Sequence, residues 1–193
     1  MADDRERFLG PTTIRFCPLC GGSLRRASVP PDHREQAVCR LCEFVFYLNP
    51  KVVAGTIPEQ DGRVLLTRRS INPGHGLWTF PGGFVDFGES VTDAAVRETL
   101  EETGHRIAPT ALVGVYRWQA PDTGATFIRF AFAGEVVAHD AARALDAGIL
   151  RVLWLGYDEL AARRATHRSP LVMRCVDDYR AGLRRPLEHI TEM

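Results

Sequence analysis

The sequence has no net charge, no long apolar run and no low-complexity tract. Across 193 residues, 24 lysines and arginines balance 24 aspartates and glutamates, so the overall charge does not draw the chain to nucleic acid or to a membrane. No stretch approaches the roughly 20 apolar residues that a bilayer-spanning helix needs. The N-terminal sequence MADDRERFLG lacks the apolar centre of a signal peptide. We therefore expect a cytoplasmic globular protein without a membrane partner.

Only five cysteines occur, and four of them form two close pairs. Cys17 and Cys20 make one Cys-x-x-Cys pair, Cys39 and Cys42 make the other, and eighteen residues separate the pairs. This spacing is typical of a four-cysteine zinc ribbon, because each tight turn directs two thiolates at one tetrahedral ion. Four thiolates leave no open position on the ion, so Zn²⁺ would be structural. It would supply folding free energy to a segment with little apolar surface.

Other interpretations of this segment stay open. The four cysteines could instead be buried or joined in disulfides, although a reducing compartment disfavours disulfides. The basic side chains of the segment could hold RNA or simply form a solvated face; they are Arg15, Arg25, Arg26, Arg34 and Arg40. The fifth cysteine, Cys175, lies in the apolar run LVMRCV and is expected to pack in the core.

After the ribbon, the pattern is one of mixed strands and helices. Asp61-Gly62 separates two apolar runs and predicts a hairpin of strands over 51–58 and 63–69. The glycine- and proline-rich segment 70–83 predicts a loop with a short strand at LWTF. Later runs predict three strands and two helices, over 111–120, 125–137, 151–157, 157–165 and 169–185.

This order lacks a regular β-α-β alternation. It favours a mixed sheet with helices packed against it, within the broad α/β or α+β class, over a doubly wound parallel fold. We expect two domains, a zinc ribbon over 1–47 and a larger domain over 48–193.

The local excess of charge is acidic and lies at 82–105, GGFVDFGESVTDAAVRETLEETGH. Residues 90–103 predict a helix that Ser90 and Asp93 cap and Gly104 ends. On that helix the carboxylates of Glu98, Glu101 and Glu102 project from one face and repel one another. A hard divalent cation such as Mg²⁺ would reverse the repulsion. A solvated acidic helix is the alternative.

The residues before these glutamates suit the same site. Glu89 lies in the preceding loop and can fold back toward the helix. Arg97 can pair with a loop carboxylate or with Glu101, and would then orient metal ligands without binding the ion. Gly82 and Gly83 let the backbone approach an ion or a phosphate closely.

Together these residues resemble the signature of the Nudix hydrolase family. The signature runs Gly, five residues, Glu, seven residues, Arg-Glu, an aliphatic, any residue, Glu-Glu, any residue, Gly and an aliphatic. All seven fixed places are filled at the right spacing, by Gly83, Glu89, Arg97, Glu98, Glu101, Glu102 and Gly104. Two aliphatic places depart, at Thr99 and His105. A hydrogen bond from the Thr99 hydroxyl to a helix carbonyl would make the first departure tolerable.

The resemblance covers most of residues 15–135, where the ribbon and GRVLLTRRSINPGHGLWTFPGGF are similar to zinc-ribbon Nudix proteins, FAD/ADP-ribose pyrophosphatase-like members among them. It implies a Nudix-type mixed sheet sandwiched by helices, and hydrolysis of a phosphoric anhydride bond. Glu98 and Glu102, assisted by Glu101 and the Gly82 carbonyl, would hold Mg²⁺ or Mn²⁺. Glu101 would be a candidate base.

The resemblance also suggests which residues meet the substrate. The candidates are Gly83 of the glycine loop and the aromatic side chains that flank this loop, Trp78, Phe80 and Phe84. Two further aromatic residues, Trp118 and Phe127, lie on later strands. Each aromatic side chain could stack on a base or a flavin, although core packing is the commoner role.

Two departures limit what can be carried over from relatives. The SQPWPFPQS-like run of NADH pyrophosphatases is absent, which counts against NADH. The loop LDAGILRVLWL has Gly148 and Arg151 where relatives often carry glutamate, and Asp146 is shifted. A base from that loop therefore stays unassigned, and Glu135 is a weak substitute.

The predicted substrate is a nucleoside diphosphate derivative of the ADP-ribose or FAD type. Nucleotide-capped RNA held by the basic ribbon, NADH, and a non-catalytic nucleotide sensor are the alternatives. The resemblance further suggests a homodimer.

Overall fold

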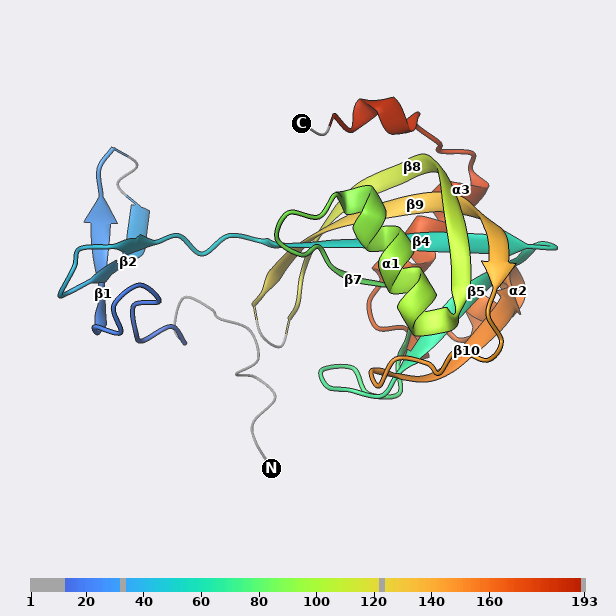
Figure 1. Cartoon of the computed structure of the whole chain (residues 1–193), viewed down its shortest axis with the longest axis horizontal. Coiled ribbons are helices and arrows are strands. Elements are labelled where there is room, and N and C mark those ends of the chain that lie inside the picture. Colours follow the sequence, from blue (N-terminus) through green and yellow to red (C-terminus); the bar gives the residue numbers. More distant parts are fainter. Residues whose placement is uncertain (1–12, 32–33, 122–123, 192–193) are drawn as a thin grey trace. The chain divides into compact units, whose positions relative to one another are not determined.

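The computed structural model describes residues 13–31, 34–121 and 124–191, which form two compact units (Figure 1). The smaller unit contains the described residues up to Lys51 together with those of Gln119–Thr126. The larger unit contains Val52–Trp118 and the described residues from Phe127 onward. The predicted boundary after residue 47 stays a prediction.

The smaller unit is built on a short antiparallel sheet. Its strands are β1 (Leu24–Val29), β2 (Arg34–Cys39) and β3 (Val45–Phe46), in the order β1-β2-β3. The central strand β2 buries Ala37, Val38 and Cys39. This is a small apolar core, as the sequence predicted.

The larger unit contains a seven-stranded sheet. Its main path runs β10-β5-β4-β9-β8, while β6 pairs with β5 and β7 pairs with β4. The strands are β4 (Lys51–Gln60), β5 (Arg63–Arg69), β6 (Trp78–Thr79), β7 (Gly82–Phe84), β8 (His105–Gln119), β9 (Thr126–His139) and β10 (Ile149–Gly156). Residues 78–84 thus lie within the sheet, beside β4 and β5.

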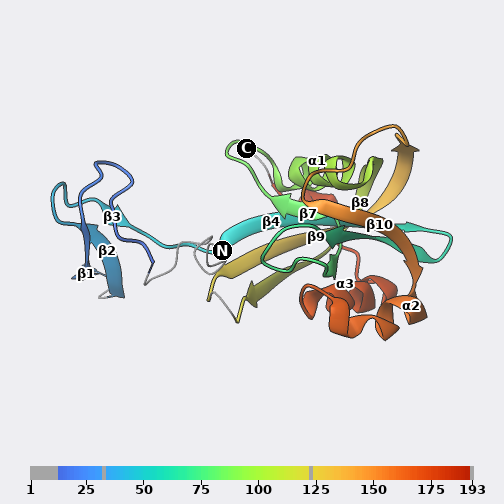
Figure 2. The same cartoon turned by 90° about the horizontal axis from the view of Figure 1, so that it is seen from below.

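Helices cover both faces of this sheet (Figure 2). Helix α1 (Val91–Thr103) lies on one face, and α2 (Tyr157–Ala162) and α3 (Leu171–Arg180) lie on the other. Two short 3-10 turns follow α2 and α3, at Arg164–Thr166 and Leu187–His189. None of the helices in the described parts of the chain is long and apolar enough to cross a membrane.

Alternating side chains of β9 supply the core on each face. Phe132 packs with Ala94 and Ala95 of α1, whereas Ala131 and Ala133 pack in the cluster that includes α2 and α3. That second cluster also contains Cys175, which is 1% exposed. The period of two along a strand therefore places successive residues in two different cores.

Most predicted elements are confirmed, but four have different bounds or type. Strand β8 begins at His105, before the predicted 111, and α2 ends at Ala162, before the predicted 165. Asp61 and Gly62 both have positive φ, 53° and 72°, as a two-residue turn of type I′ requires between β4 and β5. The glycine-rich segment was predicted to be a loop through residue 83, but Gly82 and Gly83 begin strand β7. Their small size allows close pairing with β4. Helix α3 ends at Arg180, before the predicted limit of 185.

Candidate active site and cysteine cluster

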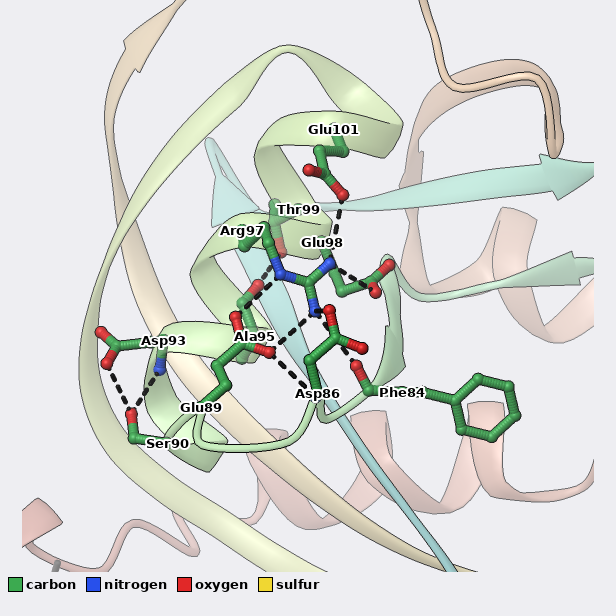
Figure 3. A network of polar contacts seen from close by, with 10 residues as sticks. All are labelled: Phe84, Asp86, Glu89, Ser90, Asp93, Ala95, Arg97, Glu98, Thr99 and Glu101. Carbon is green, nitrogen blue, oxygen red and sulfur yellow. Dashed lines mark hydrogen bonds and ion pairs between the residues drawn. The ribbon is translucent and has the colours of Figure 1, made fainter. Parts of the chain in front are cut away.

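Capping residues satisfy backbone groups at both ends of helix α1. The Ser90 hydroxyl accepts a hydrogen bond from the Asp93 amide at 2.9 Å and donates one to the Asp93 carboxylate at 2.8 Å (Figure 3). At the other end, Gly104 has φ 71° and donates to the Leu100 carbonyl. These caps fix the register of the helix, and with it the face that its glutamates share.

Arg97 lies at the centre of the acidic residues (Figure 3). Its guanidinium makes a two-pronged ion pair with Glu89, at 2.8 and 2.9 Å, and also contacts Glu98 at 2.8 Å and Glu101 at 3.2 Å. A further bond reaches the Phe84 carbonyl at 3.1 Å. The bonds between Arg97 and Glu89 lower the pKa of Glu89 and raise that of Arg97. Arg97 is therefore a positioning residue that ties the loop to the helix.

Glu102 is the most deeply buried carboxylate of the group. It accepts a hydrogen bond from the Gly82 amide at 3.1 Å and one from the Thr67 hydroxyl at 3.5 Å. Burial nevertheless raises its pKa from 4.5 to about 8. Two hydrogen bonds do not compensate for the water that this carboxylate has lost.

Glu98 lies next to Glu102 in a similarly confined place. Burial raises its pKa, although the bond from Arg97 opposes the effect. A Cβ atom added to Gly83 would lie 2.5 Å from the Glu98 carboxyl group. Glycine at position 83 therefore creates the space that this carboxylate occupies.

The residue types of this acidic group suit a hard divalent cation, although among the described residues only the four paired cysteines bring three or more potential ligand atoms within 4.8 Å of one another. Glu98 and Glu102 present desolvated carboxylates, and Glu101 adds a third that is 42% exposed. Oxygen ligands of this kind suit Mg²⁺ and Mn²⁺. A cation between them would remove the cost that raises both pKa values.

The two departures from the Nudix signature have clear packing solutions. Thr99 is fully buried, and its hydroxyl lies 2.7 Å from the Ala95 carbonyl and 2.6 Å from the Thr56 hydroxyl, as the predicted back-bond requires. His105 is 7% exposed and stacks on His139 with 4.0 Å between ring centroids. Both polar side chains are therefore accommodated in the interior, at positions where the Nudix signature has aliphatic side chains.

The aromatic candidates differ in their access to a ligand. Trp78 and Phe80 are buried in the core, whereas Phe84 is 45% exposed. Trp118 stacks on Phe127 with 5.7 Å between their ring centroids. Of the three aromatic residues that flank the glycine loop, Phe84 is the exposed one.

The late loop approaches the helix through its backbone. The Asp146 amide donates to the Glu101 carbonyl at 3.2 Å, and the negative charge of Asp146 contributes to the raised pKa of Glu98. Glu135 instead is exposed on β9, where it lines a shallow hollow with Glu59 and Gln60. The structure thus brings Asp146, and not Glu135, near the carboxylates of α1.

Two arginines near Glu102 were missed from the sequence. The positive charges of Arg69 and Arg129 both lower the pKa of Glu102, against the larger effect of burial. Arg129 stands in the apolar run FIRFAFA of β9, and a charged residue inside such a run was the available signal. Because Arg129 lies far from Glu102 in the sequence, the sequence alone did not predict that the two residues are neighbours.

The four paired cysteines converge on one point in the smaller unit. Their sulfur atoms all lie within 4.8 Å of one another, and neighbouring ones are 3.3 to 3.8 Å apart. Tetrahedral thiolates around Zn²⁺ stand about 3.8 Å apart, given Zn–S bonds of about 2.3 Å. The amides of Cys42 and Leu41 donate to the Cys39 sulfur and lower its pKa to about 6. The cluster therefore fits a structural metal.

Comparison with known protein families agrees with this interpretation of the two sites. A family model described as "NUDIX domain" matches residues 48–175. The chain belongs to the Nudix hydrolase family. A second model, the zinc-ribbon model described as "Nudix N-terminal", matches residues 15–48 of this Nudix hydrolase and contains all four clustered cysteines.

Individual relatives agree with this assignment. "Phosphatase NudJ" of Escherichia coli (strain K12) is 33% identical to this Nudix hydrolase over 141 residues, which cover 73% of this chain and 90% of the relative. A solved NUDIX hydrolase from Nitrosomonas europaea is 41% identical with a TM-score of 0.73, covering 75% of this chain and 98% of the other. The NUDIX domain of Shewanella oneidensis NrtR, solved with ADP ribose, shares the fold at 20% identity and a TM-score of 0.58. It covers 71% of this chain and 90% of the other.

Proposed function

We propose that this Nudix hydrolase cleaves the pyrophosphate link of a nucleoside diphosphate derivative of the ADP-ribose or FAD type, with Mg²⁺ or Mn²⁺ as its catalytic ion. The observation that carries the proposal is the pair of desolvated carboxylates, Glu98 and Glu102, on one face of α1. Buried carboxylates with raised pKa values are costly unless a cation or a proton joins them.

Each residue of the site has a role in this reaction. Glu98 and Glu102 would hold the ion, with Glu101 and the Gly82 carbonyl as further ligands. A bound divalent ion neutralises phosphate charge and acidifies a water molecule. Glu101 is the most exposed of the three carboxylates and would accept the proton of the attacking water. Arg97 keeps Glu89 and Glu98 in position, and Zn²⁺ on the four cysteines would serve the fold only.

Three alternative functions remain as outcomes of a test. A nucleotide sensor would bind without turnover, but the relatives called phosphatase NudJ support hydrolysis. Nucleotide-capped RNA would require the arginines of the ribbon, and its binding would weaken steeply with salt. NADH is the third candidate substrate for the same site.

The deciding experiment measures products from a substrate panel. ADP-ribose, FAD, NADH and a nucleotide-capped RNA are incubated with the protein and Mg²⁺, and released nucleotide is quantified. We expect AMP from ADP-ribose or FAD, and a loss of at least about a hundredfold in kcat for Glu102→Gln, since one ion ligand is removed. Equal turnover by the variant would refute the metal assignment. Failure of the whole panel would favour the sensor.

A second variant tests the space around Glu98 without changing any carboxylate. Gly83→Ala places a methyl group 2.5 Å from the Glu98 carboxyl group, which must then move. We expect activity to fall at least about tenfold, because small displacements of catalytic groups are costly. Gly156→Ala, whose added methyl meets an atom only at 3.5 Å, is the matched control. Full activity of Gly83→Ala would show that the Glu98 position is unimportant.

A further inference from the structure

Positive charge gathers near Glu102. The charges of Arg69 and Arg129 act on the Glu102 carboxylate, and the charge of Arg168 acts on Arg69 and lowers its pKa together with burial. The guanidinium groups of Arg69 and Arg129 thus act on one deeply buried carboxylate, and that of Arg168 acts on Arg69. A divalent cation that shared the charge of Glu102 would leave Arg69 and Arg129 able to attract another anion.

Arg129 shows the clearest sign of a missing partner. A Cβ atom added to Gly55 of β4 would lie 2.7 Å from an Nη atom of Arg129 and 2.3 Å from the Pro81 carbonyl oxygen. The guanidinium therefore lies beside the pairing of Gly55 with Gly82, whose amide holds Glu102. The Nε atom of Arg129 is buried and has no hydrogen-bond partner among the described residues. Such a donor is rare in folded proteins, because burying it unpaired costs free energy.

Arg168 is held in place from two directions. Its backbone amide donates to the Trp78 carbonyl, and its side chain packs against Gly74, where a Cβ would lie 2.4 Å from Cδ. Its guanidinium lies 5.2 Å from the Trp118 ring centroid, within the range of a cation–π contact. Trp118 in turn stacks on Phe127. The cation is thus positioned by an aromatic pair, next to Arg69.

We propose that Arg69, Arg129 and Arg168 form an anion subsite, positioned by Trp118, that binds the substrate phosphate next to the carboxylate site. The inference rests on the proposed function for the identity of the substrate, but it concerns binding and not turnover. A guanidinium presents planar, directed donors that match phosphate oxygens. The subsite therefore selects substrates with a second phosphate beyond the one held at Glu98 and Glu102.

The binding test uses the full-length protein with Mg²⁺ and two probes, inorganic pyrophosphate and ADP, measured by calorimetry. We expect Arg129→Met and Arg168→Met each to weaken ADP binding about tenfold or more, the usual size for a hydrogen bond to a charged group. Arg117→Met is the control, since Arg117 is an exposed neighbour of Trp118 on the same strand. Unchanged affinity in both subsite variants would overturn the proposal.

Stability distinguishes a binding role of Arg129 from a structural one. Methionine removes an unpaired buried donor, so Arg129→Met should unfold at the same temperature as the parent protein or higher, while it binds ADP less tightly. A structural arginine would show lower stability with unchanged affinity in the folded fraction. Arg129→Lys keeps the charge without the planar donors and should restore binding only in part.

Trp118 supplies a spectroscopic readout. Anion binding at Arg168 should change the fluorescence of Trp118, one of three tryptophans in the chain. Trp118→Phe should lose that signal and retain ADP affinity, whereas Trp118→Leu should lose both. Unchanged ADP affinity in Trp118→Leu would refute the positioning role.

The two proposals fail in different ways. ADP binding that depends on Arg129, without hydrolysis of any substrate, would leave the subsite intact and refute the pyrophosphatase. Hydrolysis with an unchanged KM in Arg129→Met and Arg168→Met would support the pyrophosphatase and refute the anion subsite. If both hold, KM should rise about tenfold in these variants while kcat changes by less than about threefold.

Discussion

At the scale of single residues, Glu102 combines two opposite demands. It is buried where it faces Gly82 and the arginines, and in the proposed reaction it would have to be ionised to hold a cation. Without the cation, burial favours the protonated form and raises the pKa to about 8. Metal binding at the proposed site would therefore compete with proton binding at this carboxylate.

This competition predicts how the stability of the metal-free protein depends on pH. The pKa of Glu102 is about 8 in the folded protein and near 4.5 when unfolded, so the folded state holds the extra proton between these values. Its stabilising contribution is complete below about pH 4.5 and is lost as the pH rises through 8. Thermal melts from pH 5 to 8 should show the parent protein losing stability relative to Glu102→Gln. Added Mg²⁺ should restore it at pH 8.

Glu101→Gln is the matched control for this measurement. The Glu101 side chain is 42% exposed and lies on the same helix, so its substitution should leave the pH dependence of the parent unchanged. A parent protein whose stability relative to Glu102→Gln stays constant from pH 5 to 8 would contradict the burial argument.

Sequence spacing predicted the residues of the helix better than those of the sheet. Glu89, Arg97 and Glu98 lie within ten residues of each other, so the helix and the loop that precedes it bring them together locally. Arg129 reaches the site from β9, across the pairing of β4 with β7. Such proximity depends on the order of strands in the sheet, which no local pattern encodes.

At the scale of elements, α1 is a rigid support whose ends are set by single residues. Ser90 satisfies an amide at the start, and Gly104 adopts φ 71° at the end. A Cβ atom at position 104 would also lie 2.8 Å from the Asp140 carbonyl oxygen. These caps were predictable because the residue types that satisfy free backbone groups are few.

Removal of the first cap should weaken the protein without altering its chemistry. Ser90→Ala loses the hydrogen bond to the Asp93 amide and should lower the free energy of unfolding by about 1 kcal/mol. Denaturant melts measure this change. Ser90→Asp, which can accept the same bond, is the control and should retain stability. A Ser90→Ala protein that keeps full stability but loses activity would show that the cap acts on the site instead.

The local sequence pattern did not predict strand β7. The segment from Ser70 to Gly83 is rich in glycine and proline, which predicts a loop. Gly82 nevertheless pairs with Gly55, and a Cβ on Gly82 would lie 2.4 Å from the Ala54 carbonyl oxygen. Glycine here permits close approach of two strands, a tertiary requirement that overrides its low strand propensity.

At the scale of the whole molecule, the chain divides into two units with different sources of stability. The larger unit has extensive apolar clusters on both faces of its sheet. The smaller unit buries few apolar side chains, while its four cysteine sulfurs lie within 4.8 Å of one another. A small domain of this kind would depend on a metal bound by these cysteines for folding.

Removal of zinc should therefore unfold one unit and leave the other folded. A zinc-selective chelator is added to the full-length protein, and amide hydrogen exchange is followed across the chain. We expect protection in β1 and β2 to be lost while protection in β5 and α1 persists, because the apolar clusters of the larger unit contain none of the four ligands. Cys39→Ser should reproduce the effect without chelator, whereas Cys175→Ser should not, since Cys175 lies outside the cluster. Protein that contains no zinc as purified, with β1 and β2 still protected, would show that the four thiols stabilise the ribbon without a metal.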